Sequence, residues 1–190
     1  MNERVQTASS VSSYDSRLPW VALVALMALA GLVGWMVLRG NGNEAKSPSR
    51  ATATAASIAE LKALPAKVGH DFYWTGAERG VTYELTQMNR GNIYVRYLPA
   101  GVEVNDPRPN FLTIGTYPRR GAYEILQKFS KSSRAVSTQL PNGGIAVYSR
   151  DTPSSVYVAY PGKDLQVELF DPSPSRAIAL VTSGKLRPIR

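Results

Sequence analysis

PWVALVALMALAGLVGWMVL, residues 19–38, is the stretch around which the rest of the chain is organised. It contains no charged side chain, and an α-helix of about twenty residues rises roughly 30 Å, the thickness of the hydrocarbon core of a bilayer. Trp20 and Trp35 lie near its two ends, where interfacial aromatic residues are common, and Arg39 follows it directly. The stretch therefore predicts a single transmembrane helix.

Two other interpretations of residues 19–38 fit less well. Ala28 and Ala30 have the small-residue spacing of a signal-peptide cleavage site. However, the apolar run continues to Leu38, beyond the roughly 7–15 residues of a signal peptide's apolar region. A helix buried in a soluble core normally shows charged or polar residues on one face, and this run carries no charge on any face. We therefore expect an uncleaved span.

The flanking sequence divides the chain into four segments. Residues 1–18 are polar and serine-rich, which predicts a disordered tail, and residues 39–56 have the composition of a flexible linker. Residues 57–190 are enough for one soluble domain. Lys and Arg residues are almost evenly divided between the two flanks of the span, so orientation rests on the stalk-like linker. We expect a cytoplasmic N-terminus and a domain outside the plasma membrane.

Residues 57–190 predict an α+β domain with one mostly antiparallel sheet. Apolar and polar residues alternate over 81–86 and 93–97, the pattern of a half-buried hairpin, with a turn at 88–91. Further strands are expected at 70–74, 111–117, 145–150, 156–160 and 165–170.

Helices are predicted at three places. Ser57 and Glu60 form a capping-box pattern, which predicts a short helix that ends near Pro65. An amphipathic helix is expected over residues 119–134, and a closing helix after the N-cap Ser173. We expect the two later helices to pack on one face of the sheet.

The two halves of the domain resemble each other. Each has a hairpin, a third strand and a helix, and Tyr94-Val95-Arg96-Tyr97 matches Tyr157-Val158-Ala159-Tyr160. A duplicated βββα unit would explain this repeat. Alternating strands also produce such matches by chance, so the sequence leaves both explanations open.

The sequence lacks the residue sets of the common catalytic and metal sites. The absence of cysteine excludes disulfides and zinc–thiolate sites, and His70 is the only histidine, so no multi-histidine site forms within one chain. Glu103 and Asp106 lack the spacing of a calcium loop, and there is no G-x-S-x-G or phosphate-loop motif. We predict no catalytic residue, metal or cofactor, and the sequence favours a non-enzymatic function over an enzymatic one.

Positive charge is the main indication of a partner. The chain has a net charge of +8, and residues 57–190 hold 17 Lys and Arg against 11 Asp and Glu. Five basic residues gather on the solvent face of the helix expected over 119–134: Arg119, Arg120, Lys128, Lys131 and Arg134. They are the candidate binding residues for an envelope protein or an anionic polymer, although an ordinary solvated helix face has the same pattern. Nucleic acid is not an expected partner, because no recognition motif is present and the domain is expected outside the cytoplasm.

Two alternatives to the partner-binding function remain. Aromatic side chains on the predicted strands could line the site of a small-ligand or lipid carrier, although such residues usually belong to a core. These aromatic residues are Phe72, Tyr73, Trp74, Tyr94, Tyr97, Tyr148, Tyr157 and Tyr160. An envelope hydrolase would need two neighbouring carboxylates, and the sequence favours no particular pair.

Several segments resemble a family of uncharacterised bacterial single-pass membrane proteins. They are YELT at 83–86, IYVRYLPAGVEV at 93–104, FLTIGTYP at 111–118, and VYVAYPG with QVELFDPSP up to residue 174. The resemblance covers about residues 67–189 and implies an N-terminal anchor with the domain outside the cytoplasm. It implies no activity, ligand or functional residue.

Overall fold

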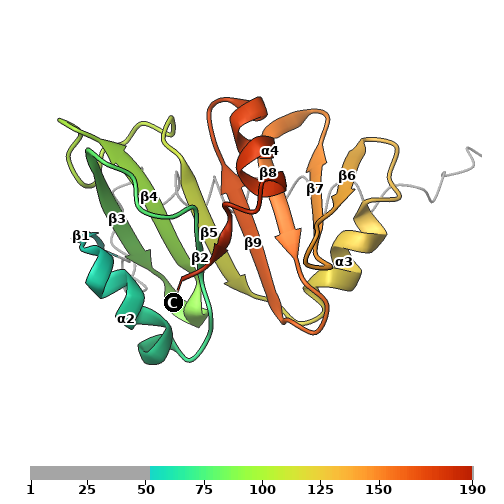
Figure 1. Cartoon of the computed structure of the whole chain (residues 1–190), viewed down its shortest axis with the longest axis horizontal. Helices are drawn as coiled ribbons and strands as arrows, with labels where there is room; N and C mark the ends of the chain where they lie inside the picture. Colours follow the sequence, from blue (N-terminus) through green and yellow to red (C-terminus); the bar gives the residue numbers. More distant parts are fainter. Residues whose placement is uncertain (1–51, 190) are drawn as a thin grey trace, which may run out of the picture. The chain divides into compact units, whose positions relative to one another are not determined.

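The structure, a computed structural model, describes residues 52–189 (Figure 1). The predicted tail, the predicted membrane span and the predicted linker as far as residue 51 lie outside the described residues. Within residues 52–189, eight strands form one sheet in the order β1-β3-β4-β5-β9-β8-β7-β6. Every neighbouring pair in this sheet is antiparallel. The predicted fold class, α+β with a mostly antiparallel sheet, is confirmed.

The elements follow one another in this order: β1 (Ala53–Ala56), α2 (Ile58–Val68), β2 (Tyr73–Trp74), β3 (Val81–Gln87), the 3-10 turn η1 (Asn89–Gly91), β4 (Ile93–Pro99), β5 (Thr113–Pro118), α3 (Ala122–Phe129), β6 (Ala135–Gln139), β7 (Ile145–Ser149), β8 (Thr152–Ala159), β9 (Leu165–Phe170), α4 (Pro174–Thr182) and β10 (Arg187–Pro188). No helix in this part of the chain is long and apolar enough to cross a bilayer.

The folded domain begins earlier than predicted. Residues 53–56 belong to the predicted linker, but they form β1 and pair with β3, with Ala56 opposite Tyr83. Their Ala and Thr composition resembles that of a linker, so the strand forms because a neighbouring edge offers backbone partners rather than from its own propensity.

The capping box at the start of α2 is confirmed, but the predicted end near Pro65 is wrong. Ser57 accepts from the backbone N–H of Glu60, and the Glu60 carboxylate accepts from the backbone N–H of Ser57 at 2.7 Å. The helix continues through Pro65 to Val68, and Gly69 ends it with a positive φ of 77°. The proline removes one hydrogen bond, while burial of Leu61 and Leu64 holds the helix on the sheet.

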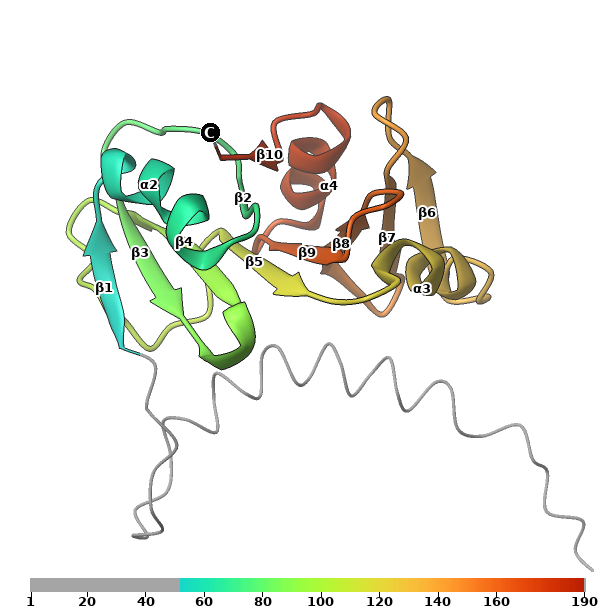
Figure 2. The same ribbon diagram turned by 90° about the horizontal axis from the view of Figure 1, so that it is seen from below.

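The expectation that the two later helices share one face is wrong. In Figure 2, α2, α4 and the small β2–β10 sheet lie on one side of the main sheet, and α3 lies on the other. We call these the front and back faces, with the front toward the viewer in Figure 1. On β7, Ala146 belongs to the front cluster, whereas Ile145 and Val147 pack with Leu126 of α3 at the back. Successive strand residues point to opposite faces, so each helix uses its own set.

The helix predicted over 119–134 is also shorter than expected. It spans Ala122–Phe129, and residues 135–139 form β6, an edge strand that the sequence analysis did not predict. Serines at 130, 132 and 133 follow the helix, and their tendency to bond locally to the backbone favours a turn. The closing helix α4 begins after Ser173 as predicted, and the side chain of Ser173 accepts from the N–H of Arg176.

The main sheet consists of two four-stranded halves joined through β5 and β9 (Figure 1). We call β1, β3, β4 and β5 the N-half, and β6 to β9 the C-half. On the front face, β10 pairs with β2, and the ring of Tyr73 stacks on that of Tyr160 at 5.6 Å. These contacts tie β10 and the residue after β8 to β2, and the front face buries one continuous hydrophobic core.

The pairing registers of the two halves correspond. Val95 and Val158, the second residues of the repeated YVxY segments, are both fully buried in the front cluster. Tyr94 lies opposite Gly115, Tyr157 lies opposite Glu168, and Gly115 lies opposite Glu168 where the halves meet. These registers are those of a local two-fold axis perpendicular to the sheet at the Gly115–Glu168 pair.

Candidate functional site

The centre of the back face carries a row of polar and aromatic side chains. Tyr94, Tyr117, Ser155, Tyr157 and Glu168 come from the four central strands β4, β5, β8 and β9. We call them the tyrosine–glutamate strip. All five are half-buried, and of these Tyr157 packs against the apolar cluster of α3, which contacts β7, β8 and β9. The strip is therefore an accessible polar surface in the middle of the sheet.

Glu168 is the centre of the strip. Its Oε2 accepts a hydrogen bond from the Tyr117 hydroxyl at 2.8 Å, and its Oε1 accepts from Ser155 at 2.9 Å and from Tyr157 at 3.3 Å. Burial raises the pKa of the Glu168 carboxyl above its ordinary value, and the three hydrogen bonds oppose that rise. Among the described residues, no Lys, Arg or His forms an ion pair with Glu168.

The tyrosines around Glu168 are held as neutral donors. Burial and the negative charge of Glu168 raise the pKa of both Tyr117 and Tyr157. The rings of Tyr94 and Tyr117 meet edge to face, with centroids 5.6 Å apart and planes at 80°. Burial raises the pKa of Tyr94 too. The strip thus presents one carboxylate surrounded by aromatic rings and neutral hydroxyl groups.

Gly115 makes this arrangement possible. A Cβ at residue 115 would collide with the hydroxyl oxygen and ring of Tyr117. The glycine therefore leaves the space through which the Tyr117 ring lies across β5 toward Glu168. This is a requirement for close approach rather than for an unusual backbone angle.

A second carboxylate on the back face has a different environment. Glu84 in β3 is 1% exposed and pairs with Arg96 of β4 at 2.7 Å. Arg96 also donates to the carbonyl oxygens of Asp106 and Arg108 and lies over the ring of Phe111. This ion pair fixes the loop over residues 100–112 against the N-half, as a structural anchor.

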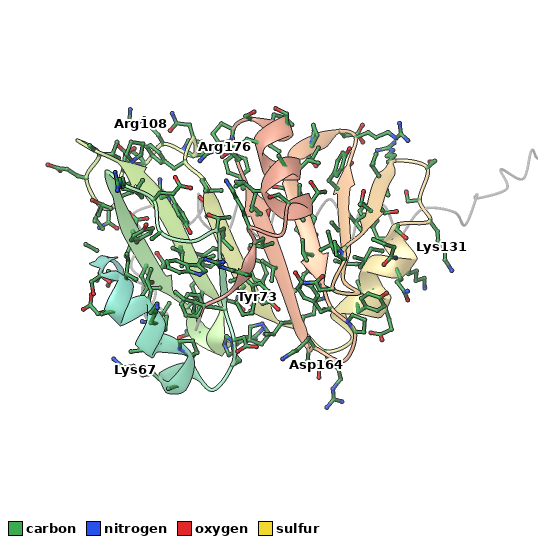
Figure 3. All side chains as sticks on the ribbon, in the orientation of Figure 1. Lys67, Tyr73, Arg108, Lys131, Asp164 and Arg176 are labelled. Carbon is green, nitrogen blue, oxygen red and sulfur yellow. The ribbon has the colours of Figure 1, made fainter. Side chains whose placement is uncertain are left out.

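The five predicted basic residues do not share one helix face. Only Lys128 lies within α3. Arg119 and Arg120 precede the helix, where the Arg119 N–H donates to the Asp164 carbonyl at 2.7 Å. Lys131 and Arg134 follow it, and Figure 3 shows Lys131 beyond the end of α3. The structure thus separates the basic residues into a pair before the helix and a group after it.

Lys128, in the last turn of α3, and the two basic residues after the helix lie on the segment that leads to β6. Lys128, Lys131 and Arg134 are exposed, and the backbone N–H of Arg150, also exposed, donates to the Arg134 carbonyl at 2.9 Å. Arg134 forms an ion pair with Asp151 at 3.3 Å in which both side chains are more than 60% exposed. We call Lys128, Lys131, Arg134, Arg150 and the strand β6 the cationic side.

Strand β6 is an open edge of the sheet. Its residues are half-buried or exposed and uncharged, and in the part of the chain that the structure describes it pairs only with β7. At one end of the β6–β7 pairing the backbone N–H of Arg150 donates to the carbonyl of Arg134. At the other end the N–H of Leu140 donates to the carbonyl of Gly144. Because hydrogen-bonded pairs alternate in antiparallel strands, Ser137 and Gln139 turn their backbone groups away from β7. Such groups can accept another strand.

The other predicted candidate residues lie in the hydrophobic core or contact backbone groups. The rings of Phe72, Tyr73, Trp74 and Tyr97 are buried in the front core. The imidazole of His70 contacts the carbonyl oxygens of Asp71 and Gly91, at 2.7 and 2.9 Å. No cluster of three His, Cys, Asp or Glu side chains suited to a metal ion occurs within residues 52–189.

Comparisons with protein-family models, with curated proteins and with solved structures find no match for this chain. The resemblance to a family of bacterial single-pass membrane proteins therefore rests on the quoted sequence segments and stays a prediction.

Sequence reasoning missed Glu168 and the open strand β6. Alternation in residues 165–170 does place Glu168 on the face opposite the core. However, its hydroxyl donors come from β5 and β8, and only the strand order brings them together. Local patterns carry no information on that order.

Proposed function

We propose that the chain is a single-pass membrane protein whose α+β domain lies outside the cytoplasm and binds an envelope protein or an anionic envelope polymer. The observation that supports binding is the cationic side, where four exposed Lys and Arg residues lie beside an open strand edge. Its charges would attract an anionic partner, and its backbone groups would bond to an extended one.

The ion pair of Arg134 in the cationic side competes only weakly with an anionic partner. Arg134 pairs with Asp151 at the exposed surface, and such pairs contribute about 0–1 kcal/mol. An anionic group can therefore replace Asp151 at little cost. Arg119 and Arg120, at the other end of α3, would contribute to the long-range field rather than to this contact.

The proposed anchor would keep the domain near the membrane. The predicted span ends at residue 38 and β1 begins at Ala53, so residues 39–52 form the tether. A fully extended tether of this length reaches at most about 50 Å. The domain would then meet partners at the membrane surface or in the layer next to it.

Charge reversal at the cationic side tests the binding proposal. The full chain in dodecyl maltoside micelles is titrated into fluorescent poly-L-glutamate, and anisotropy is followed at two salt concentrations. The variant K128E/K131E/R134E should bind about tenfold more weakly, with a smaller salt dependence, because exposed charges each contribute up to about 1 kcal/mol.

The matched control is K62E/K67E/R79E, which changes the net charge equally at exposed residues of α2 and of the loop between β2 and β3. It should keep most of the wild-type affinity. Equal losses in both variants would mean that net charge alone drives binding, and would contradict a cationic side.

The small-ligand alternative is supported by one observation, the tyrosine–glutamate strip. A lipid carrier would need an apolar cavity, and the hollow between α4 and strands β7 and β8 has a volume of about 10 Å³, room for about one water molecule. A ligand of this domain is therefore better sought on the strip than beneath α4.

For the fold, we infer that the two halves arose by duplication of a strand unit. The matching YVxY segments place equivalent residues on the same face of the sheet in β4 and β8. The strand pairings of the two halves are related about the Gly115–Glu168 pair. The helices break the symmetry, since α3 and α4 lie on opposite faces. Sequences of relatives test this, because the two halves should share more positions in some of them than here.

A further inference from the structure

We propose that the tyrosine–glutamate strip binds an organic cation, an ammonium or guanidinium group, with the Glu168 carboxylate as its counter-ion. The site lies at the centre of the back face and shares no residue with the cationic side, and the inference does not depend on the proposed function.

Glu168 differs from the buried carboxylates of the domain in the partners of its charge. The other two most deeply buried carboxylates each have an arginine: Glu84 has Arg96 at 2.7 Å, and Asp171 has Arg176 at 3.0 Å. Among residues 52–189, only hydroxyl groups bond to the Glu168 carboxylate, although the domain contains an excess of Lys and Arg. In a half-buried place, an ionised carboxylate without a cation is the group that gains most from a cationic ligand.

The Glu168 carboxylate can accept a further hydrogen bond. Its two oxygens offer about four acceptor positions, and the hydroxyl groups of Tyr117, Ser155 and Tyr157 use three. One position stays available to a further N–H donor. An ammonium or guanidinium group supplies both that donor and the missing charge.

Aromatic rings surround the Glu168 carboxylate. Tyr94, Tyr117 and Tyr157 come from three different strands around Glu168, and their hydroxyl groups remain neutral. Ring faces of this kind attract cations, the more so when a carboxylate lies beside them. An anion would instead meet the charge of Glu168 and hydroxyl groups that already donate to it.

The site is open to a ligand from one side. All five side chains of the strip keep part of their surface exposed. In the described part of the chain, the loop over residues 100–112 covers Arg96 of the N-half, and α3 covers Ile145 and Val147 of the C-half. The tyrosine–glutamate strip lies between that loop and α3.

The test uses the full chain in dodecyl maltoside micelles, with ¹³C-labelled tyrosine observed by NMR. The probes are choline and N-acetylarginine amide. The control is 3,3-dimethyl-1-butanol, which has the shape of choline without its charge. We expect choline or the arginine amide to shift the resonances of Tyr94, Tyr117 and Tyr157 in a saturable manner, and the neutral alcohol to leave them unchanged.

Two variants separate a binding site from a purely structural network. E168Q should weaken cation binding at least tenfold, and E103Q, which removes an exposed carboxylate elsewhere in the same domain, should leave it unchanged. Should E168Q fail to fold, Y117F keeps the ring and the carboxylate but removes one hydroxyl group, and it should still bind.

Three results would overturn the proposal. The absence of any saturable shift with both cations would show that Glu168 only ties the strands together. Equal shifts from choline and the neutral alcohol would show that charge is not recognised. Unchanged cation affinity in folded E168Q would place the binding elsewhere.

Discussion

The two halves of the sheet use the same backbone pairing with opposite chemistry on the back face. When the YVxY segments are aligned, the cross-strand pair Glu84–Arg96 of the N-half corresponds to Ile145–Ala159 of the C-half. The first is an ion pair whose arginine holds a loop, and the second is an apolar pair under α3. The half with the ion pair is thus covered by a loop, and the half with the apolar pair is covered by a helix.

This difference also explains why α3 lies on the back face. The back of the C-half offers Ile145, Val147 and Ala159 to an apolar helix face that includes Ala122 and Leu126. The back of the N-half offers a charged pair that only hydrogen-bonding backbone can satisfy. Helix α3 therefore covers the following half rather than the strands that precede it.

The largest loss of stability is expected when only the arginine of the Glu84–Arg96 ion pair is removed. Arg96→Met leaves the Glu84 carboxylate buried without a cation and releases the loop over residues 100–112. We expect a loss of about 3–5 kcal/mol in the free energy of unfolding, measured by chemical denaturation.

The double variant Glu84→Ile/Arg96→Ala gives the N-half the side-chain pair of the C-half and so sharpens the comparison. It should recover much of the lost stability while the loop stays open to proteolysis, because no buried charge remains but the anchor is absent. A double variant as unstable as Arg96→Met would contradict the assigned role of the ion pair.

A smaller effect is expected where the halves meet. Gly115→Ala places a methyl group against the Tyr117 ring, and overpacking of this kind destabilises by about 1–3 kcal/mol. Adding Tyr117→Ala removes the collision, so the penalty of Gly115→Ala should fall in that background. Thermal unfolding of the four variants of the cycle measures this coupling, and simple additivity would count against the close approach.

The smallest effect is a change in pH dependence. Because the pKa of Glu168 is raised above its ordinary 4.5, the folded state keeps the proton at pH values where the unfolded chain has lost it. Glu168 therefore lowers stability as pH rises from 4.5 through its folded pKa. In Glu168→Gln this decline should disappear. Asp106, whose pKa Arg108 lowers to about 2, titrates below that window and does not interfere.

Denaturation of wild type and Glu168→Gln over a pH series provides the measurement. Parallel curves above pH 4.5 would show that Glu168 has an ordinary pKa and a well-solvated carboxylate. That result would also weaken the contrast with the buried Glu84.

The features that sequence predicted are those that local patterns determine. Alternation located β3 and β4, the Ser57–Glu60 pair located the start of α2, and Ser173 with Pro174 located that of α4. Each depends on residues a few positions apart, whose periodicity or capping chemistry is visible in one stretch.

The missed features depend on partners distant in sequence. Strand β1 has the composition of a linker and exists through its pairing with β3, and β6 follows a helix whose basic residues extended the amphipathic pattern. The face chosen by α3 depends on Ile145 and Ala159, which come later in the chain. Of the candidate sites, the basic residues were identified but placed on one helix face, and Glu168 was not singled out.

The most direct test of the account is the side of the membrane on which the domain lies. The chain has no cysteine, so one introduced residue can be labelled selectively. Ser133→Cys, in an exposed position between α3 and β6, and Ser10→Cys, in the predicted tail, are each treated with a membrane-impermeant maleimide in spheroplasts of a bacterial host. The account predicts labelling of residue 133 before lysis and of residue 10 only after lysis. The reverse pattern would place the domain in the cytoplasm and contradict an extracytoplasmic binding module.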